Sequence, residues 1–321
     1  MRDVAAGAGT DLGRAGWRIA PPRGYRSQKV VFTLEGGDGP RAIVKLTQDR
    51  RFNPRLANEH SALAALEAAG VAPGLAPRAA FRAEHAGLLL VGQSHLDGQP
   101  LRGRAQPSPD CPVVAAVLDA LIGLGASTAA RAPAGDVTAA LSELLEHHRR
   151  VHAPQPRRLR ALEAAFAALG EAGDDLPTVF LHGDVNTHNI LIAEGTRVGL
   201  VDWENAEPAG LPGWDLTYFV NACAQWEAEL RGPRVTPASV TRRLTAEGPW
   251  RDLLAGALGR LMTQVGLPRE LLPGVLLGFW MQLALRESTL LPEGDAAGGL
   301  YARVLERMID EDAPGRLARL V

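Results

Sequence analysis

The sequence predicts an α+β fold in which a small antiparallel sheet with one helix is followed by a larger, mainly helical region. Short runs of β-branched residues, separated by glycine-rich turns, fill the first hundred residues. Farther along the chain, apolar residues recur at the spacing of amphipathic helices. A second group of short apolar runs, within residues 178–201, interrupts these helices and predicts a few more strands. Together these patterns predict two lobes of unequal size.

Local patterns predict the elements of the first lobe. Residues 30–34 and 42–46 are β-branched runs on either side of a glycine-rich turn at 36–40, which is typical of a hairpin. Residues 54–69 carry leucines at helical spacing, with a proline at the start and Gly70 just after the end, so we expect a helix there. Two further strands are expected to complete the sheet, at residues 79–82 and 88–91.

The second lobe is predicted to begin after the turn at residues 98–100, where the pattern changes from strands to helices. Helices are expected at residues 113–124, 137–150 and 158–169, and again from about residue 214 onward. The interrupting strands are expected at residues 178–181, 190–192 and 198–201. We therefore divide the chain into three parts: a flexible tail (1–20), an N-terminal lobe (21–97) and a C-terminal lobe (98–321).

The composition predicts a folded globular protein and narrows its partners. With 321 residues, of which 46% are hydrophobic, the chain can bury a substantial core. Its net charge of -2 provides no positive field for nucleic acid. The apolar stretch 271–291 is interrupted by Pro273, Gly274 and charged residues, so it predicts a buried helix and no membrane span. Cys111 and Cys223 form no disulfide or metal pattern, which favours a cytoplasmic location. Nothing in the sequence indicates an obligate protein partner.

The residues suited to catalysis are concentrated in two segments, 180–191 and 199–204. Asp184, Asn189 and Asp202 lie there on loops bracketed by short apolar strands, which can hold loop side chains in one cleft. Phosphoryl transfer needs a carboxylate at the acceptor hydroxyl and oxygen ligands for Mg²⁺ on the phosphates. Asp184 can supply the first. Asn189 and Asp202 can supply the second, because Mg²⁺ usually takes one or two oxygen ligands from a protein.

A positive group must also meet the phosphates, and Lys45 lies near the end of the second strand of the predicted hairpin. Glu59 follows fourteen residues later on the predicted helix, from which it can pair with Lys45. Two alternatives stay open at this point. Lys45 can be an edge-strand lysine that blunts strand pairing, and Asn58 or Glu67 are rivals of Glu59 on the same helix.

These motifs point to a known family. The string His182-Gly183-Asp184, with Asn189 five and Asp202 eighteen residues after the aspartate, closely resembles the catalytic and metal motifs of the aminoglycoside phosphotransferase-like family of small-molecule kinases, which includes choline kinases. The resemblance implies that Asp184 is the catalytic base. It also implies that Asn189 and Asp202 hold Mg²⁺.

The resemblance extends over roughly residues 25–290 and implies a protein-kinase-like two-lobed fold that binds ATP or GTP in the N-terminal lobe. By that likeness, Lys45 contacts the α- and β-phosphates and Glu59 orients Lys45. Further nucleotide contacts are implied from a phosphate loop and from backbone groups of the hinge between the lobes, at Ser27, Ser94 and Leu96. The sequence thus predicts a phosphotransferase that moves the γ-phosphoryl group to a hydroxyl of a small molecule.

Three alternatives are weighed against this prediction. The loop 26–29 has no glycine, which motivates a nucleotide-binding regulator without transferase activity. A protein kinase is disfavoured because His182-Gly183-Asp184 stands in place of His-Arg-Asp. A transition-metal site of His182, Asp184 and His188 is chemically feasible, but no further His or Cys cluster completes its ligand set.

The acceptor is the least determined part of the prediction. A polycationic aminoglycoside would need a dense acidic lining. The candidate acids lie in the last hundred residues: Glu227, Glu229, Glu287, Asp310, Glu311 and Asp312. Antibiotic resistance is therefore one role among several, beside metabolic or biosynthetic phosphorylation of hydroxyl groups.

Overall fold

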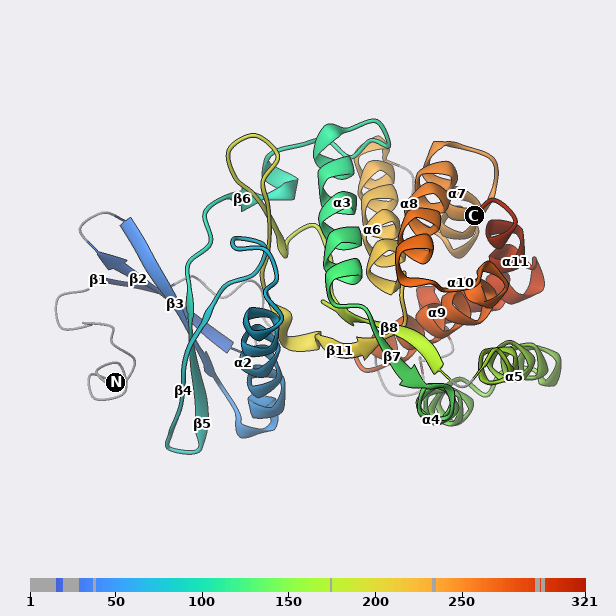
Figure 1. The fold of residues 1–321 in the computed structure, drawn as a ribbon, viewed down its shortest axis with the longest axis horizontal. Helices are drawn as coiled ribbons and strands as arrows, with labels where there is room; N and C mark the ends of the chain where they lie inside the picture. Colours follow the sequence, from blue (N-terminus) through green and yellow to red (C-terminus); the bar gives the residue numbers. More distant parts are fainter. Residues whose placement is uncertain are drawn as a thin grey trace. The chain divides into compact units, whose positions relative to one another are not determined.

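The computed structural model of the protein describes residues 16–19, 29–36, 39–173, 175–232, 235–291, 295 and 298–321. The chain forms two compact units. Unit 1 comprises Met1–Arg104 and His182–Pro208, and unit 2 comprises Ala105–Leu181 and Ala209–Val321. A sheet-rich N-terminal part and a helical C-terminal part confirm the predicted α+β fold (Figure 1). The boundaries predicted near residues 20 and 97 stay predictions, while unit 1 also takes in the later segment 182–208.

The main sheet of unit 1 has five antiparallel strands in the order β1-β2-β3-β5-β4. The predicted hairpin is β2 (Lys29–Gly36) and β3 (Gly39–Thr47), and the two further predicted strands are β4 (Ala79–His85) and β5 (Leu88–Ser94). A short strand that the sequence did not reveal, β1 (Gly16–Ile19), pairs with β2 inside the segment expected to be a tail. The other residues of that expected tail lie outside the described part of the chain.

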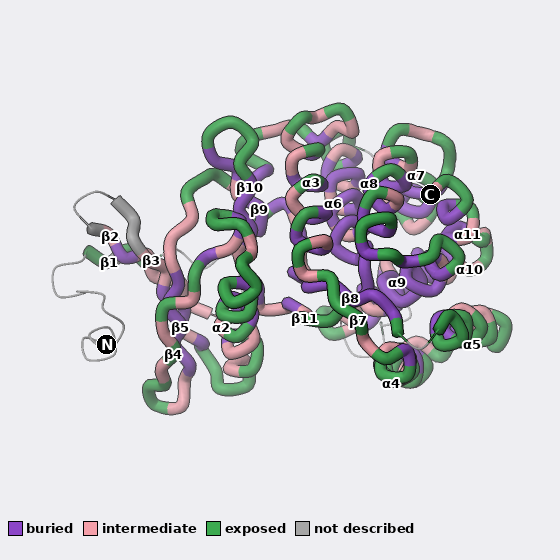
Figure 2. Tube along the Cα trace, viewed as in Figure 1, coloured by how far each residue is buried: buried purple, intermediate pink, exposed green. Residues whose placement is uncertain are grey.

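One helix covers this sheet, α2 (Asn53–Ala68), where the sequence predicted it (Figure 1). A short 3₁₀ turn, η1 (Arg50–Phe52), leads into α2, and a proline lies in the first helical turn, where its missing N–H costs no hydrogen bond. Leu56 on the buried side of α2 packs with Leu89 and Val91 of β5 in a small apolar core. Figure 2 shows this alternation of buried and exposed residues along α2.

The segment 182–208 adds a second, smaller sheet to unit 1. Its strands are β9 (Ile190–Ile192) and β10 (Val198–Leu200), joined by β6 (Gln99–Pro100) in the order β10-β9-β6. Two 3₁₀ turns belong to the same region, η2 (Leu101–Gly103) and η3 (Trp203–Asn205). These short strands hold the two loops that carry Asp184 and Asp202, as the sequence predicted.

Unit 2 is mainly helical. Its helices are α3 (Pro112–Ser127), α4 (Ala134–His152), α5 (Pro156–Glu171), α6 (Trp214–Arg231), α7 (Pro237–Thr245), α8 (Pro249–Val265), α9 (Leu272–Ser288), α10 (Leu300–Asp310) and α11 (Ala313–Ala318), with the 3₁₀ turn η4 (Arg269–Leu271) before α9. A three-stranded sheet has the order β11-β8-β7, with β7 (Ala130–Pro133), β8 (Asp175–Leu181) and β11 (Glu207–Gly210).

Helix α9 is the apolar stretch that the sequence predicted to be a buried helix. Most of its side chains are buried, among them Trp280, Met281 and Ala284. Figure 2 shows it as a largely buried segment. Across the described part of the chain, we find no helix with the length and apolar character that crossing a bilayer requires.

Candidate active site

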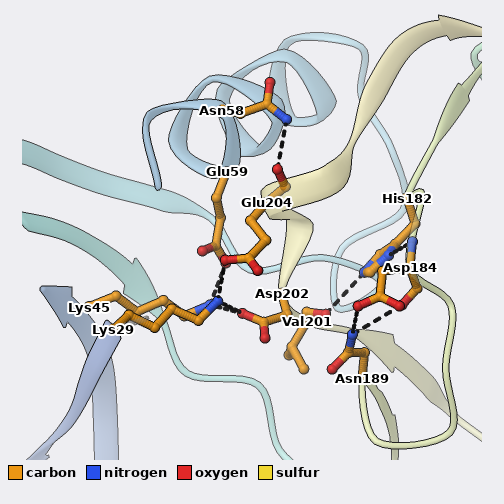
Figure 3. A network of polar contacts seen from close by, with 10 residues as sticks. All are labelled: Lys29, Lys45, Asn58, Glu59, His182, Asp184, Asn189, Val201, Asp202 and Glu204. Atoms are coloured by element: carbon orange, nitrogen blue, oxygen red, sulfur yellow. Dashed lines mark hydrogen bonds and ion pairs between the residues drawn. The ribbon is translucent and has the colours of Figure 1, made fainter. Parts of the chain in front are cut away.

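A buried ion pair joins the sheet of unit 1 to its helix. Lys45 points from β3 and Glu59 points from α2, and the Nζ of Lys45 lies 2.5 Å from Oε1 of Glu59 (Figure 3). Both residues are buried, with 4% of Lys45 and 0% of Glu59 exposed. A buried charge must be paired to be tolerated, so each of these side chains fixes the other.

The rival residues on α2 have other places. Asn58 donates its amide hydrogens to the backbone carbonyls of Glu204 and Ala206, at 3.1 and 2.9 Å, and so attaches α2 to η3. Glu67 lies on the exposed side of α2. Among the three polar candidates, Glu59 is therefore the one that the structure brings to Lys45.

Asp202 is the meeting point of two lysines. Its Oδ1 accepts hydrogen bonds from Nζ of Lys45 at 2.7 Å and from Nζ of Lys29 at 2.5 Å. Lys29 also contacts Oε2 of Glu204 at 2.7 Å. The backbone of Asp202 has φ 73° and ψ 57°, a left-handed conformation that is uncommon outside glycine, although aspartate and asparagine adopt it more readily than other residues. Such conformations persist only where the surrounding structure holds them, and they are frequent at functional sites.

The charges in this cluster shift the pKa values of its members. Burial on its own raises the pKa of Asp202, but the attraction of Lys45 and then Lys29 outweighs it and holds that pKa well below its ordinary range. Burial on its own lowers the pKa of Lys45, but Asp202 and then Glu59 outweigh it and raise that pKa above its ordinary range. Both side chains are therefore charged at every physiological pH.

The second cluster surrounds Asp184. Its Oδ1 accepts from Nδ2 of Asn186, and its Oδ2 accepts from Nδ2 of Asn189, each at 3.0 Å. Asn189 also donates to the backbone carbonyl of Asp184 at 3.0 Å. Since the nitrogen of Asn189 is used toward Asp184, its side-chain oxygen points the other way, as Figure 3 shows. The backbone N–H of Val201 donates to the carbonyl of Asn189 at 2.9 Å, which ties this loop to the residue before Asp202.

His182 provides a second connection between the two loops. One ring nitrogen, Nε2, lies 3.0 Å from the carbonyl oxygen of Val201, and the other, Nδ1, accepts from the backbone N–H of Asp184 at 3.2 Å. A carbonyl can only accept and a backbone N–H can only donate, so His182 carries its proton on Nε2. The imidazole is fully buried against Trp203, with the ring centroids 4.5 Å apart.

Gly183 is required between these two residues. Its φ is +76°, and a Cβ built on it would lie 2.1 Å from the carbonyl oxygen of Asn205. A side chain there would displace backbone, so the glycine allows η3 to approach the loop closely. The motif His182-Gly183-Asp184 is thus explained residue by residue: a histidine that connects two loops, a glycine that gives space, and a carboxylate held by two amides.

The remaining predicted nucleotide contacts are placed only in part. Ser94 ends β5, its backbone N–H donates to the carbonyl of Arg78 at 2.9 Å, and its hydroxyl accepts from the backbone N–H of Arg78 at 2.9 Å. Leu96 lies two residues after the end of β5. Both residues line a cavity of about 510 Å³ beside the C-terminal end of α2. Ser27 lies outside the described residues.

The donor set fits Mg²⁺. Asn189 and Asp202 offer hard oxygen atoms, and the three carboxylates of Asp202, Glu204 and Glu59 contact only two ammonium groups, so the cluster keeps a net negative charge that favours a cation. No group of three or more His, Cys, Asp or Glu that could hold a metal occurs in the described ranges. The zinc alternative also loses its first ligand, because His182 uses both ring nitrogens on the backbone.

Most of the acids considered for an acceptor pocket already have partners within unit 2. Glu227 binds Arg231 and the indole N–H of Trp250, and Glu287 accepts the backbone N–H groups of Leu300 and Tyr301 at the start of α10. The other paired acids contact arginines: Asp310 with Arg157 and Arg158, Glu311 with Arg307, and Asp312 with Arg319. These contacts hold unit 2 together and do not gather the acids into one lining.

Sequence reasoning gave too little weight to Lys29 and Glu204. Neither residue is among the site residues that the sequence predicted. One signal was available: Lys29 and Lys45 are the two lysines of a chain with 34 lysine and arginine residues in total. Both meet at Asp202.

The structure brings together an antiparallel sheet with one helix packed on it, a lysine–glutamate pair between them, and two loops that carry Asp184 and Asp202, the arrangement that the sequence predicted for a phosphotransferase with a kinase-like fold. The phosphotransferase enzyme family (APH) matches residues 18–259, well over half of the chain. The chain belongs to this family. The resemblance noted in the sequence is confirmed, and so is the predicted class, a small-molecule phosphotransferase with an alcohol group as acceptor.

Solved structures share the fold at low sequence identity. The macrolide 2'-phosphotransferase MphH of Brachybacterium faecium is 17% identical, with a TM-score of 0.51 over 94% of this chain and 96% of that one. The choline kinase LicA of Streptococcus pneumoniae is 13% identical, with a TM-score of 0.46 over 97% of each chain. At 17% identity the likeness to the macrolide 2'-phosphotransferase shows the fold alone. No curated protein sequence matches the chain.

Proposed function

We propose that this protein transfers the γ-phosphoryl group of ATP or GTP to a hydroxyl group of a small molecule, with Asp184 as the catalytic base. One observation carries the proposal. Asp184 and Asn189 lie on one loop and are hydrogen-bonded to each other, and two further hydrogen bonds, Val201 to Asn189 and His182 to Val201, join this loop to the one that carries Asp202. A base and two metal-type oxygen donors on one braced pair of loops are what phosphoryl transfer needs.

Asp184 accepts the proton of the acceptor hydroxyl in this proposal. Its two oxygens accept hydrogen bonds from the amides of Asn186 and Asn189, which fix the plane of the carboxylate without neutralising it. A positioned general base contributes roughly 10²- to 10⁴-fold to a rate. Because the reaction uses little covalent chemistry, the position of this carboxylate matters as much as its basicity.

Lys45 binds the α- and β-phosphates, and Glu59 keeps its ammonium group in place through the buried ion pair. Asn189 and Asp202 would hold Mg²⁺, which when bound neutralises phosphate charge. The hinge receives the base of the nucleotide through the backbone carbonyl of Ser94 and the backbone N–H of Leu96. Ser27 belongs to the proposed phosphate loop.

The deciding experiment is an acceptor screen with a phosphate-transfer readout. The purified protein, ATP or GTP and Mg²⁺ are incubated with aminoglycosides, macrolides, choline, other amino alcohols and sugars, and phosphorylated products are detected by mass spectrometry. The comparison is with Asp184→Asn, and the matched control is Asp119→Asn, which removes the same charge from an exposed ion pair on α3.

We expect one acceptor class to be phosphorylated, and Asp184→Asn to lower turnover by roughly 10²-fold or more while Mg²⁺-ADP still binds in calorimetry. The control should keep the turnover of the natural protein. Unchanged turnover in Asp184→Asn would show that the base is misassigned. Nucleotide binding without any product across the whole library would favour the regulatory alternative.

A further inference from the structure

Both lysines of this chain contact the same oxygen atom. The chain has 34 lysine and arginine residues, and the two lysines are Lys29 and Lys45. Their Nζ atoms lie 2.5 and 2.7 Å from Oδ1 of Asp202. Both lysines of an arginine-rich sequence therefore meet at one carboxylate oxygen.

The sheet register explains how the two lysines meet. Lys29 pairs with Thr47 across β2 and β3, and Val31 pairs with Lys45. Alternate residues of a strand point to the same face, so Lys29, Val31, Lys45 and Thr47 share one face of the sheet. The lysines are therefore diagonal neighbours, and each can reach the loop that carries Asp202 (Figure 3).

The two lysines have different second partners. Lys45 is anchored deep in unit 1 by Glu59, whose side chain is fully buried. Lys29 bridges Asp202 to Glu204, and its side chain is 15% exposed. Lys29 thus bridges two carboxylates with a single positive charge, and oxygen donors of this kind are the ones a hard divalent cation prefers.

We propose that Lys29 is a built-in counter-cation of the metal site. In the nucleotide-free protein its ammonium group occupies the oxygens of Asp202 and Glu204. When a metal-nucleotide complex binds, Lys29 leaves these oxygens and places its charge on the phosphates. This inference rests on the proposed function and adds to it a competition between an amino-acid side chain and the metal for the same oxygen.

The competition has a consequence for the order of binding. A free divalent cation must displace Lys29 and gains no phosphate in return, so it binds the nucleotide-free protein poorly. A metal-nucleotide complex offers the displaced ammonium group phosphate oxygens as new partners. The free energy gained at the phosphates then offsets the free energy lost at Asp202 and Glu204. Lys29 thereby couples the binding of metal to the binding of nucleotide.

The test measures Mn²⁺ binding to the nucleotide-free protein, by calorimetry or by the EPR signal of free Mn²⁺, and ADP binding in the presence of EDTA. Lys29→Met keeps the length of the side chain and removes its charge. Lys29→Arg keeps the charge. Arg82→Met is the matched control, because it removes one exposed positive charge from β4 of the same sheet.

We expect Lys29→Met to bind Mn²⁺ at least about tenfold more tightly than the natural protein, which corresponds to about 1.4 kcal/mol, and to bind metal-free ADP more weakly by a similar factor. Lys29→Arg should bind Mn²⁺ within about threefold of the natural protein. The Arg82→Met control should leave both affinities unchanged. Thermal unfolding of each variant establishes that it is folded.

The outcomes separate this inference from the proposed function. If the natural protein binds Mg²⁺-ADP and Lys29→Met gains no affinity for Mn²⁺, the counter-cation role is wrong and the proposed function stands. If Lys29→Arg gains as much affinity as Lys29→Met, charge competition is not the cause and the inference is also overturned. If the natural protein binds no nucleotide at all, both fail together.

Discussion

The substitution Gly183→Ala gives the sharpest test of the active-site geometry. A Cβ at this position would lie 2.1 Å from the carbonyl oxygen of Asn205, whereas ordinary contacts begin near 3.4 Å, so backbone must move by about 1.3 Å. Alanine must also adopt the φ of +76°, at a cost of about 1 to 2 kcal/mol. Since Asp184 is the next residue, the displacement is transmitted to the proposed base.

A shift of about 1 Å in a catalytic group can lower a rate by roughly 10²-fold, which is what we expect for kcat in Gly183→Ala. The assay is steady-state phosphorylation of the acceptor found by the screen, together with calorimetry of Mg²⁺-ADP. We expect nucleotide affinity to change by less than about threefold, because Lys45 and the hinge are on other segments.

Gly195→Ala is the matched control. Gly195 lies in the turn between β9 and β10 with φ +67°, and a Cβ there would meet nothing within 4 Å. This variant carries the same left-handed strain without the clash, so it should lose about 1 kcal/mol of stability and keep its kcat. If the two variants had the same kcat, the close approach of Asn205 to Gly183 would not govern the position of Asp184, and the reasoning would be refuted.

Two further predictions concern buried histidines. Replacing His182 by leucine removes its hydrogen bond to Val201 on the other loop and its hydrogen bond to the backbone of Asp184. We therefore expect the free energy of unfolding, measured by urea denaturation, to fall by about 2 to 4 kcal/mol, and kcat to fall as well. An unchanged midpoint would count against the connecting role. Burial, followed by the charges of His152 and His147, lowers the pKa of His148 to about 4. The unfolded chain binds this proton near pH 6.5, so the folded state loses stability as the pH falls from 6.5 toward 4, by up to about 3 kcal/mol, and His148→Leu should flatten that part of the profile.

The sequence predicted those features that depend on short-range periodicity. The hairpin, α2 and the strands around Asp184 were found because their residues repeat with the period of a strand or a helix. The pairing of Lys45 with Glu59 could also be predicted, because few other residues of that strand and of the helix that follows it are candidates for the pair. The contact between Asn189 and Asp184 is local, within one loop.

The features that the sequence did not reveal depend on register and side-chain direction. Lys29 reaches Asp202 because of the pairing of β2 with β3, which includes an irregularity at Leu34 and Glu35 that composition does not predict. The two ring nitrogens of His182 contact the carbonyl of Val201 and the backbone N–H of Asp184. Its tautomer follows from these two contacts, so it depends on the positions of both loops. β1 has four residues, too few for a periodic pattern to be recognised.

The two acid clusters of unit 1 have opposite electrostatic surroundings, and this difference supports the division of roles between them. Asp202 contacts two ammonium groups, which stabilise its charge and suit a carboxylate that exchanges cations. Asp184 is oriented by two side-chain amides, which are neutral donors. A general base acts through the position of its carboxylate, whereas a metal ligand must remain ionised while its partners change. His182 and Asn189 both bond to Val201, the residue before Asp202, and so hold the two clusters in a fixed position relative to each other. Each cluster nevertheless keeps its own electrostatic surroundings.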